Sequence, residues 1–145
     1  MKTRQWLIPA AGLTILFILA LFLTPAASAA DIRSGGTIEI KEGETVPDDL
    51  YAFAETVYVN GTIQGDLVAF ATQVVIGPTG IVEGDLLAAG QSLVIEGTVQ
   101  DDARVAQAAI TLEETALIGD DLMAAGYSLE TKPGSQVGGS LTFAG

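Results

Sequence analysis

A two-residue phrase, Gly-Asp or Asp-Asp, recurs along this chain at nearly constant intervals and restricts the possible folds more than any other feature. The second residue of the phrase falls at Asp49, Asp66, Asp85, Asp102 and Asp121, and Ser140 takes the next place. The successive intervals are 17, 19, 17, 19 and 19 residues. Such regularity in 145 residues predicts a stacked architecture, in which each repeat is one structural unit that packs on the next.

Alignment of the repeats on this phrase places apolar residues in common columns. The column that directly follows the phrase holds Leu50, Leu67, Leu86, Ala103, Leu122 and Leu141. Further columns contain Val, Ile, Leu and Ala, and within each repeat the apolar residues alternate with variable ones, which is the period of a β-strand. We therefore expect three short strands in each repeat, at about residues 66–71, 73–77 and 80–83 in the second one.

Three strands per repeat, stacked repeat on repeat, predict an all-β fold: a single-stranded parallel β-helix (β-solenoid) of about six triangular rungs of 17–19 residues. The usual sense of parallel crossovers favours a right-handed coil. At about 4.8 Å for each rung, the rod would be roughly 25–30 Å long. The two extra residues of the longer repeats fall in turn-forming segments at one corner, such as 77–80 and 132–135, so that corner is expected to face solvent.

The first 29 residues differ from the rest of the chain. Lys2 and Arg4 precede an uncharged apolar run at residues 6–23, and small residues follow at Ala27 and Ala29. This pattern predicts a signal peptide cleaved after Ala29, with an N-terminal membrane anchor as the alternative. Residues 30–35 would then be a short lead, and residues 36–145 a solenoid whose C-terminal end is open or truncated. Either interpretation places the solenoid outside the cytoplasm, at the cell envelope or secreted, with membrane contact only through the N-terminal segment.

Composition excludes several classes of function. The chain has no cysteine and no histidine, which excludes zinc sites built from those ligands and any mechanism with a histidine base. Beyond residue 30 there are eighteen acidic and four basic residues, a net charge of −14 that disfavours nucleic acid. Because apolar columns fill the interior of so small a coil, no ligand cavity is expected there. We predict no catalytic residue, no cofactor and no enzyme activity.

The repeated aspartates allow two interpretations. Asp and Gly commonly hold tight turns through bonds from the side chain to the backbone, and this role is favoured. A stack of carboxylates could instead bind calcium, with candidate ligands Asp49, Asp66, Asp85, Asp102 and Asp121. The aromatic residues Tyr51, Phe53, Tyr58 and Phe70 lie near one another in the first rungs. Their packing is the favoured interpretation, and an exported module that binds cell-wall polysaccharide is the alternative function.

The two ends of the rod are the remaining candidate site. A terminal rung of a solenoid leaves strand edges and apolar columns uncovered unless a cap protects them. We therefore predict self-assembly through the terminal rungs, with Ile38 and Ile40 at one end and Leu141 and Phe143 at the other.

The segments GTIQGDLVA (61–69), GIVEGDLLAAG (80–90) and IEGTVQDDA (95–103) resemble the repeats of bactofilins, which are polymer-forming cytoskeletal proteins. The resemblance covers about residues 36–145. It implies a right-handed triangular β-helix that polymerises through its ends without nucleotide and acts as a scaffold for cell shape or envelope enzymes. Mostly cytosolic bactofilins lack an export signal, so this chain resembles an exported or membrane-tethered variant whose partners are other copies of itself and cell-wall or envelope components.

Overall fold

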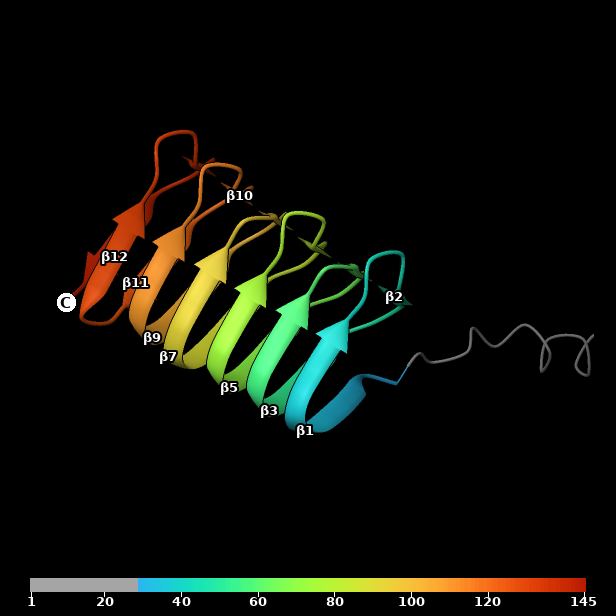
Figure 1. The fold of residues 1–145 in the computed structure, drawn as a ribbon. Coiled ribbons are helices and arrows are strands. Elements are labelled where there is room, and N and C mark those ends of the chain that lie inside the picture. The colour runs from blue at the N-terminus through green and yellow to red at the C-terminus, as the bar shows by residue number, and fades with distance from the viewer. Residues whose placement is uncertain (1–28) are drawn as a thin grey trace, which may run out of the picture.

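The computed structural model describes residues 29–145, which form a rod of stacked β-rungs (Figure 1). Ten-residue strands make up most of each rung: β1 (Asp31–Ile40), β3 (Leu50–Val59), β5 (Leu67–Ile76), β7 (Leu86–Ile95) and β9 (Ala103–Leu112). Two-residue strands complete the rungs: β2 (Thr45–Val46), β4 (Thr62–Ile63), β6 (Ile81–Val82), β8 (Thr98–Val99), β10 (Leu117–Ile118) and β13 (Gln136–Val137). The remaining strands are β11 (Leu122–Ala125), β12 (Ser128–Thr131) and β14 (Leu141–Ala144).

All of the strand pairs are parallel, and each strand pairs with its equivalent in the next rung. The long strands form one sheet in the order β1-β3-β5-β7-β9-β11-β14, with β12 also paired to β9, and the short strands form a second sheet. The register places Leu50 beside Leu67 and Leu67 beside Leu86, as the alignment of repeats predicts. The predicted fold class, a parallel β-solenoid of about six rungs, is therefore confirmed; its handedness stays a prediction.

Each rung has two strands where three were expected, because the first two predicted strands are continuous. In β5 the buried positions are 67, 69 and 71 and then 74 and 76, so the alternation slips by one residue at the bend. The pairing omits only the residue at that bend, as between Ala71 and Gln73. The long strand thus covers two sides of the triangle, here called the first face (residues 50–54 and equivalents) and the second face (residues 56–59 and equivalents). The short strands form the third face.

The core is a stack of aliphatic layers inside the triangle. Its buried members run from Ile38 to Ala124, and most of them are entirely inaccessible to water. Parallel strands stack identical positions above one another, so each column contributes one side chain to each layer and the layers fill without a ligand cavity. The described residues therefore contain a complete hydrophobic core.

Turns of two lengths alternate at the corner between the second and third faces. The longer turns close with a hydrogen bond between their first and last residues, as from the Gly80 N–H to the Gly77 carbonyl at 2.9 Å. The hydroxyl of Thr79 also donates to the carbonyl of Asn60 in the shorter turn below, at 2.7 Å, and Thr115 repeats this contact with Glu96. The longer turn thus folds over the shorter one. Both project from the rod, as predicted (Figure 1).

The predicted signal peptide or anchor lies almost wholly outside the described residues. Between residues 29 and 145 there is no helix with the length and apolar character needed to span a bilayer. β1 begins at Asp31, so residues 31–35, expected to be a lead, already form the first face of the first rung.

Candidate functional site

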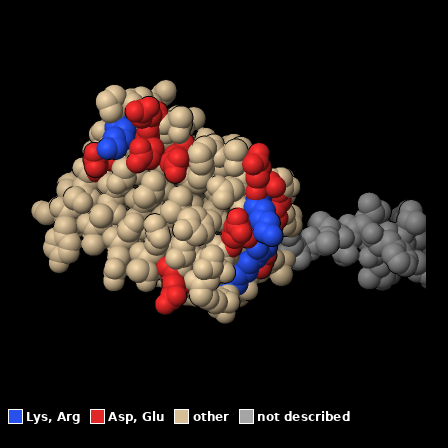
Figure 2. Space-filling model, viewed as in Figure 1, with Lys and Arg blue, Asp and Glu red and all other residues tan. Residues whose placement is uncertain are grey.

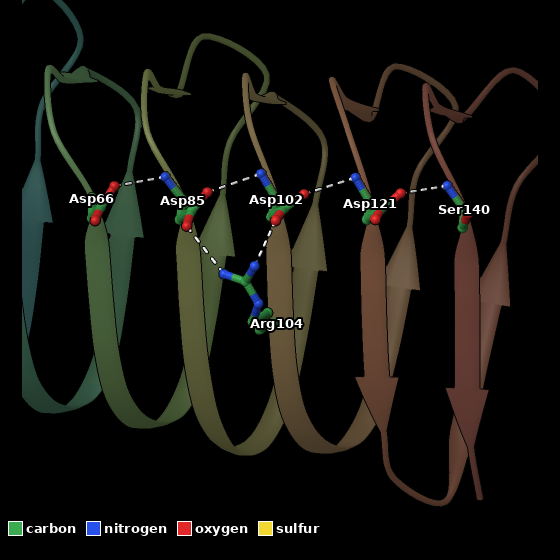
Figure 3. A network of polar contacts seen from close by, with 6 residues as sticks. All are labelled: Asp66, Asp85, Asp102, Arg104, Asp121 and Ser140. Carbon is green, nitrogen blue, oxygen red and sulfur yellow. Dashed lines mark hydrogen bonds and ion pairs between the residues drawn. The ribbon is translucent and has the colours of Figure 1, made fainter.

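The repeated aspartates form a continuous ladder of hydrogen bonds along one corner of the rod (Figure 3). In this aspartate ladder, the carboxylate Oδ1 of each residue accepts the backbone N–H of its equivalent one rung later. The ladder consists of Asp49, Asp66, Asp85, Asp102 and Asp121, with Ser140 as the last donor. Each side chain therefore satisfies a backbone donor at the turn where a strand begins, which supports the turn-holding interpretation.

The residue before each ladder aspartate affects how closely the rungs approach. Where it is glycine, the ladder bond measures 2.8 Å to Asp66 and Asp85 and 2.7 Å to Ser140. Where it is aspartate, the bond measures 3.1 Å to Asp102 and 3.0 Å to Asp121. A Cβ atom at Gly84 would clash with the carboxylate Oδ1 of Asp66, which explains why glycine allows the shorter contact. The Gly-Asp phrase is thus a packing unit that spans two rungs.

Arg104 is the one basic residue that contacts the ladder among residues 29–145. Its guanidinium donates to Oδ2 of Asp85 at 3.1 Å and to Oδ2 of Asp102 at 2.6 Å, and so bridges two rungs (Figure 3). Its own side chain is half exposed, so the pairs contribute little to stability, on the order of 0–1 kcal/mol each. Alternating directions along a strand place residues 102 and 104 on the same side, which explains the second contact.

The calcium hypothesis gains no geometric support from these contacts. One oxygen of each ladder carboxylate already accepts a backbone N–H, and residues 29–145 hold no group of three acidic side chains arranged to hold a metal ion. Calcium binding by the five aspartates stays a prediction, which thermal melts with and without calcium would test.

An ion-pair cluster lies at the N-terminal end of the rod. Asp31 and Arg33 occupy the same inward columns as Leu50 and Ala52 in the next rung. Arg33 donates to the carboxylate of Asp31 at 2.9 and 3.0 Å and to that of Glu44 at 3.2 Å. The first rung therefore presents charge where later rungs present apolar side chains, as expected of a capping repeat. Figure 2 shows basic and acidic side chains gathered at this end.

The cluster shifts the pKa values of two of its members. The hydrogen bond to Asp31 is the main reason that the pKa of Arg33 is raised above its ordinary value. The pKa of Glu44 is lowered, first by the backbone N–H of Lys41, which donates to its carboxylate at 3.1 Å, and then by Arg33. Both shifts favour the charged forms, so the cluster is ionised at neutral pH.

The four residues predicted to mediate self-assembly have two different environments. Ile38 and Ile40 are buried within the first rung, beneath the ion-pair cluster. Leu141 and Phe143 lie on β14 and are 45% and 38% exposed, although their equivalents Leu122 and Ala124 are buried. Self-assembly through these residues stays a prediction, and only the pair on β14 presents apolar surface to solvent.

The aromatic residues of the first rungs do not make an obvious sugar platform. The rings of Phe53 and Phe70 stack on each other, with centroids 5.6 Å apart and planes 8° apart. Both are nearly half exposed on the first face, whereas Tyr58 lies on the second face. The stack supports the packing role, and polysaccharide binding stays a prediction.

One buried polar side chain was missed in the sequence. Gln107 is 1% exposed, at the bend between the first and second faces, and neither atom of its amide has a hydrogen-bond partner within the described part of the chain. It pairs in register with Gly90 of the rung before. Its outward-looking neighbours gave no signal of burial, but the slip of one residue at the bend turns position 107 inward.

The fold and the ends together define a class of protein: a small-coil parallel β-solenoid with a filled core, whose exposed features are its faces, its ladder corner and its terminal rungs. Residues 39–142 match the family model for Bactofilin, described as polymer-forming cytoskeletal. This match covers well over half of the chain, and the chain belongs to the bactofilin family. No curated protein matches the chain. No solved structure matches it either.

Proposed function

We propose that this protein is a structural scaffold that assembles end to end into filaments or oligomers at the extracytoplasmic face of the cell envelope. The observation that carries the proposal is the match to a polymer-forming family over residues 39–142, which include nearly every strand of the rod. The family polymerises with itself, which supports a homopolymer. A structural role without catalysis follows from the same family membership.

The terminal rungs supply a physical route to assembly. β14 pairs with β11 on one side, and no strand among the described residues pairs with its other edge. A strand of another copy placed there would continue the parallel sheet and cover Leu141 and Phe143. Burial of the two side chains would contribute about 1–2 kcal/mol each, at roughly 25 cal/mol for each Å² of apolar surface. The first rung offers its own strand edge on β1, with charge rather than apolar side chains at its inward columns.

The envelope location is supported by the sequence of the first 29 residues. Lys2 and Arg4, the uncharged run at residues 6–23 and the small residues at Ala27 and Ala29 together favour export. The acidic solenoid would then lie outside the cytoplasm, near cell-wall components. Expression of the full chain in bacteria, followed by fractionation and measurement of the mass of the N-terminus, tests this part. A cytosolic chain that keeps residue 1 would contradict it.

Light scattering and electron microscopy test the assembly itself. Purified protein should form particles much larger than one chain, and their abundance should rise with concentration. The variant Leu141→Asp places a charge on the exposed apolar surface of β14 and should reduce assembly. Leu117→Asp is the matched control, because Leu117 is a similarly exposed leucine, 39% accessible, in the middle of the rod. Assembly that is equally impaired by both variants would contradict an end-to-end contact.

A further inference from the structure

The first face carries a groove of about 440 Å³ on its outer surface. A column of small side chains forms its floor, with one residue from each of four successive strands: Ala89, Ala106, Ala125 and Ala144. Phe70 heads the same column, and Leu87 and Met123 stand beside it in the neighbouring outward column. The groove therefore runs along the rod axis, across the strands.

The groove is apolar although it faces solvent. Phe70, Leu87 and Met123 are 46%, 45% and 59% exposed, and the alanine column between them adds no polar group. Outward positions of a solvated strand are usually polar, so this face departs from the expected alternation. A contiguous exposed apolar patch of this kind commonly marks an interaction site.

The aspartate ladder borders this face with negative charge. Arg104 projects from the wall of the groove and binds the outer oxygens of Asp85 and Asp102, which shows that neighbouring ladder carboxylates can hold a guanidinium. Smaller clefts lie on each side of Arg104, one bordered by Asp66 and the other by Asp121. Among the described residues, no cation pairs with Asp66 or Asp121. A partner with basic side chains would find the same geometry there.

The backbone of the face determines what can lie on it. The strands β5, β7, β9 and β11 bond to their neighbours on both sides, so an extended peptide placed across them would leave its own backbone groups unpaired. An α-helix satisfies its backbone internally. The four steps from Phe70 to Ala144 span about 19 Å at ~4.8 Å for each rung, which corresponds to roughly 13 helical residues. The helical pitch of about 5.4 Å is close to the rung spacing.

Charge selects among the possible occupants. A second copy laid face to face would bring two acidic ladders together, and an anionic lipid surface would be repelled by the net charge of the chain. A helix with an apolar side and a basic flank matches both features of the face. We propose that the groove binds a basic amphipathic helix of another polypeptide, its apolar side on the alanine column and its Arg or Lys side chains on Asp66 and Asp121. The rod would then carry its partner on its side while its ends remain free for assembly.

A displayed peptide library tests this proposal. Random peptides of about 16 residues, long enough to span the groove as a helix, are selected on residues 29–145, and the enriched ones are tested again on the full-length chain. Enriched peptides should place Leu, Ile, Phe or Met at positions i, i+4 and i+7 and Arg or Lys on one flank. The same peptides should bind the full-length chain with similar affinity.

Two variants locate the site. Ala106→Glu fills the middle of the floor with a charge and should weaken binding at least tenfold, roughly the cost of burying an unpaired polar group. Ala109→Glu is the control: an exposed alanine on the same strand, but on the second face, whose substitution should change affinity less than twofold. The double variant Asp66→Asn with Asp121→Asn leaves the groove intact and should weaken binding about fivefold at low salt, with a smaller effect at high salt.

Several results would overturn the proposal. These are no enrichment, enriched peptides without the basic amphipathic pattern, or equal effects of Ala106→Glu and Ala109→Glu. Loss of binding to the full-length chain would show that its own N-terminal segment occupies the groove. Dimerisation of the rod through this face would show that a second copy is the occupant.

Discussion

Oδ1 of Asp66 accepts the backbone N–H of Asp85, 19 residues later in the chain, at 2.8 Å. This single contact links the start of one rung to the start of the next. Its repetition along the rod explains why the Gly-Asp phrase recurs in the sequence at the period of a rung. The phrase records how two rungs pack, and its aspartate serves the backbone of the following rung.

Removal of one ladder carboxylate should destabilise the rod measurably. Asp66→Ala leaves the N–H of Asp85 without its acceptor and should lower the free energy of unfolding by about 1 kcal/mol. Asp66→Asn keeps an acceptor oxygen and should lose less than half of that amount. Urea denaturation measures both. Asp101→Ala is the control, because that side chain is exposed and makes no hydrogen bond among the described residues. An equal loss in Asp101→Ala would contradict a specific role of the ladder.

The glycine before a ladder aspartate should be coupled to the carboxylate of the previous rung. Gly84→Ala introduces a Cβ that clashes with Oδ1 of Asp66 and with the backbone of Gly65, and should cost about 1–2 kcal/mol. Part of this cost disappears when the carboxylate is absent, so the double variant with Asp66→Ala should lose less than the sum of the two single variants. A double-mutant cycle measured by urea denaturation gives the coupling. Strict additivity would show that the carboxylate and Gly84 do not interact.

Replacement of the buried glutamine should stabilise the rod. Gln107 leaves both amide atoms without a partner among residues 29–145, which costs roughly 1–3 kcal/mol. Gln107→Leu removes this cost at similar volume and should raise the free energy of unfolding by about 1 kcal/mol. Gln107→Ala would leave a void and should gain less. If Gln107→Leu is clearly destabilising, the amide has a role that this arrangement does not explain.

The ion-pair cluster of the first rung should make stability depend on acid. Because the folded state lowers the pKa of Glu44, this group stabilises the fold at pH values above the ordinary glutamate range, near 4.3, and the contribution disappears as the pH falls through the lowered value. Glu44 is about one-third exposed, so the effect should stay below about 1 kcal/mol.

Thermal melts between pH 7 and pH 3 measure this contribution. The midpoint of the unmodified protein should fall more steeply below pH 4 than that of Glu44→Gln, which has already lost the charge. Glu42→Gln, in the same exposed turn, should follow the unmodified protein. Parallel curves for the unmodified protein and Glu44→Gln would remove the cluster from the account of the N-terminal end.

Much of the fold could be predicted because a parallel solenoid repeats its packing in its sequence. Leu67 and Leu86 stack because each occupies the same place in its rung, and alignment alone detects this. The bend within the long strands was missed because a slip of one residue at Thr72 also resembles a break between two strands. That slip turns Gln107 inward.

The contacts of the candidate site were harder to predict because they join residues from different rungs at positions without a repeated pattern. Asp31 and Arg33 occur once, in a segment interpreted as a lead, although they lie 19 residues before Leu50 and Ala52 and so fit the repeat. Arg104 interrupts an apolar column, and its link to Asp85 becomes visible only when the rungs are stacked. The groove follows from small residues at positions 89, 106 and 125, whose shared direction depends on the bend.

The proposed end-to-end polymer is tested most directly by negative-stain electron microscopy of the purified protein over a range of concentrations. We predict filaments or short rods with a repeat of about 30 Å along their axis, close to six rungs of ~4.8 Å, that persist in Leu117→Asp and are shortened or lost in Leu141→Asp. Single particles of one chain at every concentration, with the mass of a monomer by light scattering, would contradict the account.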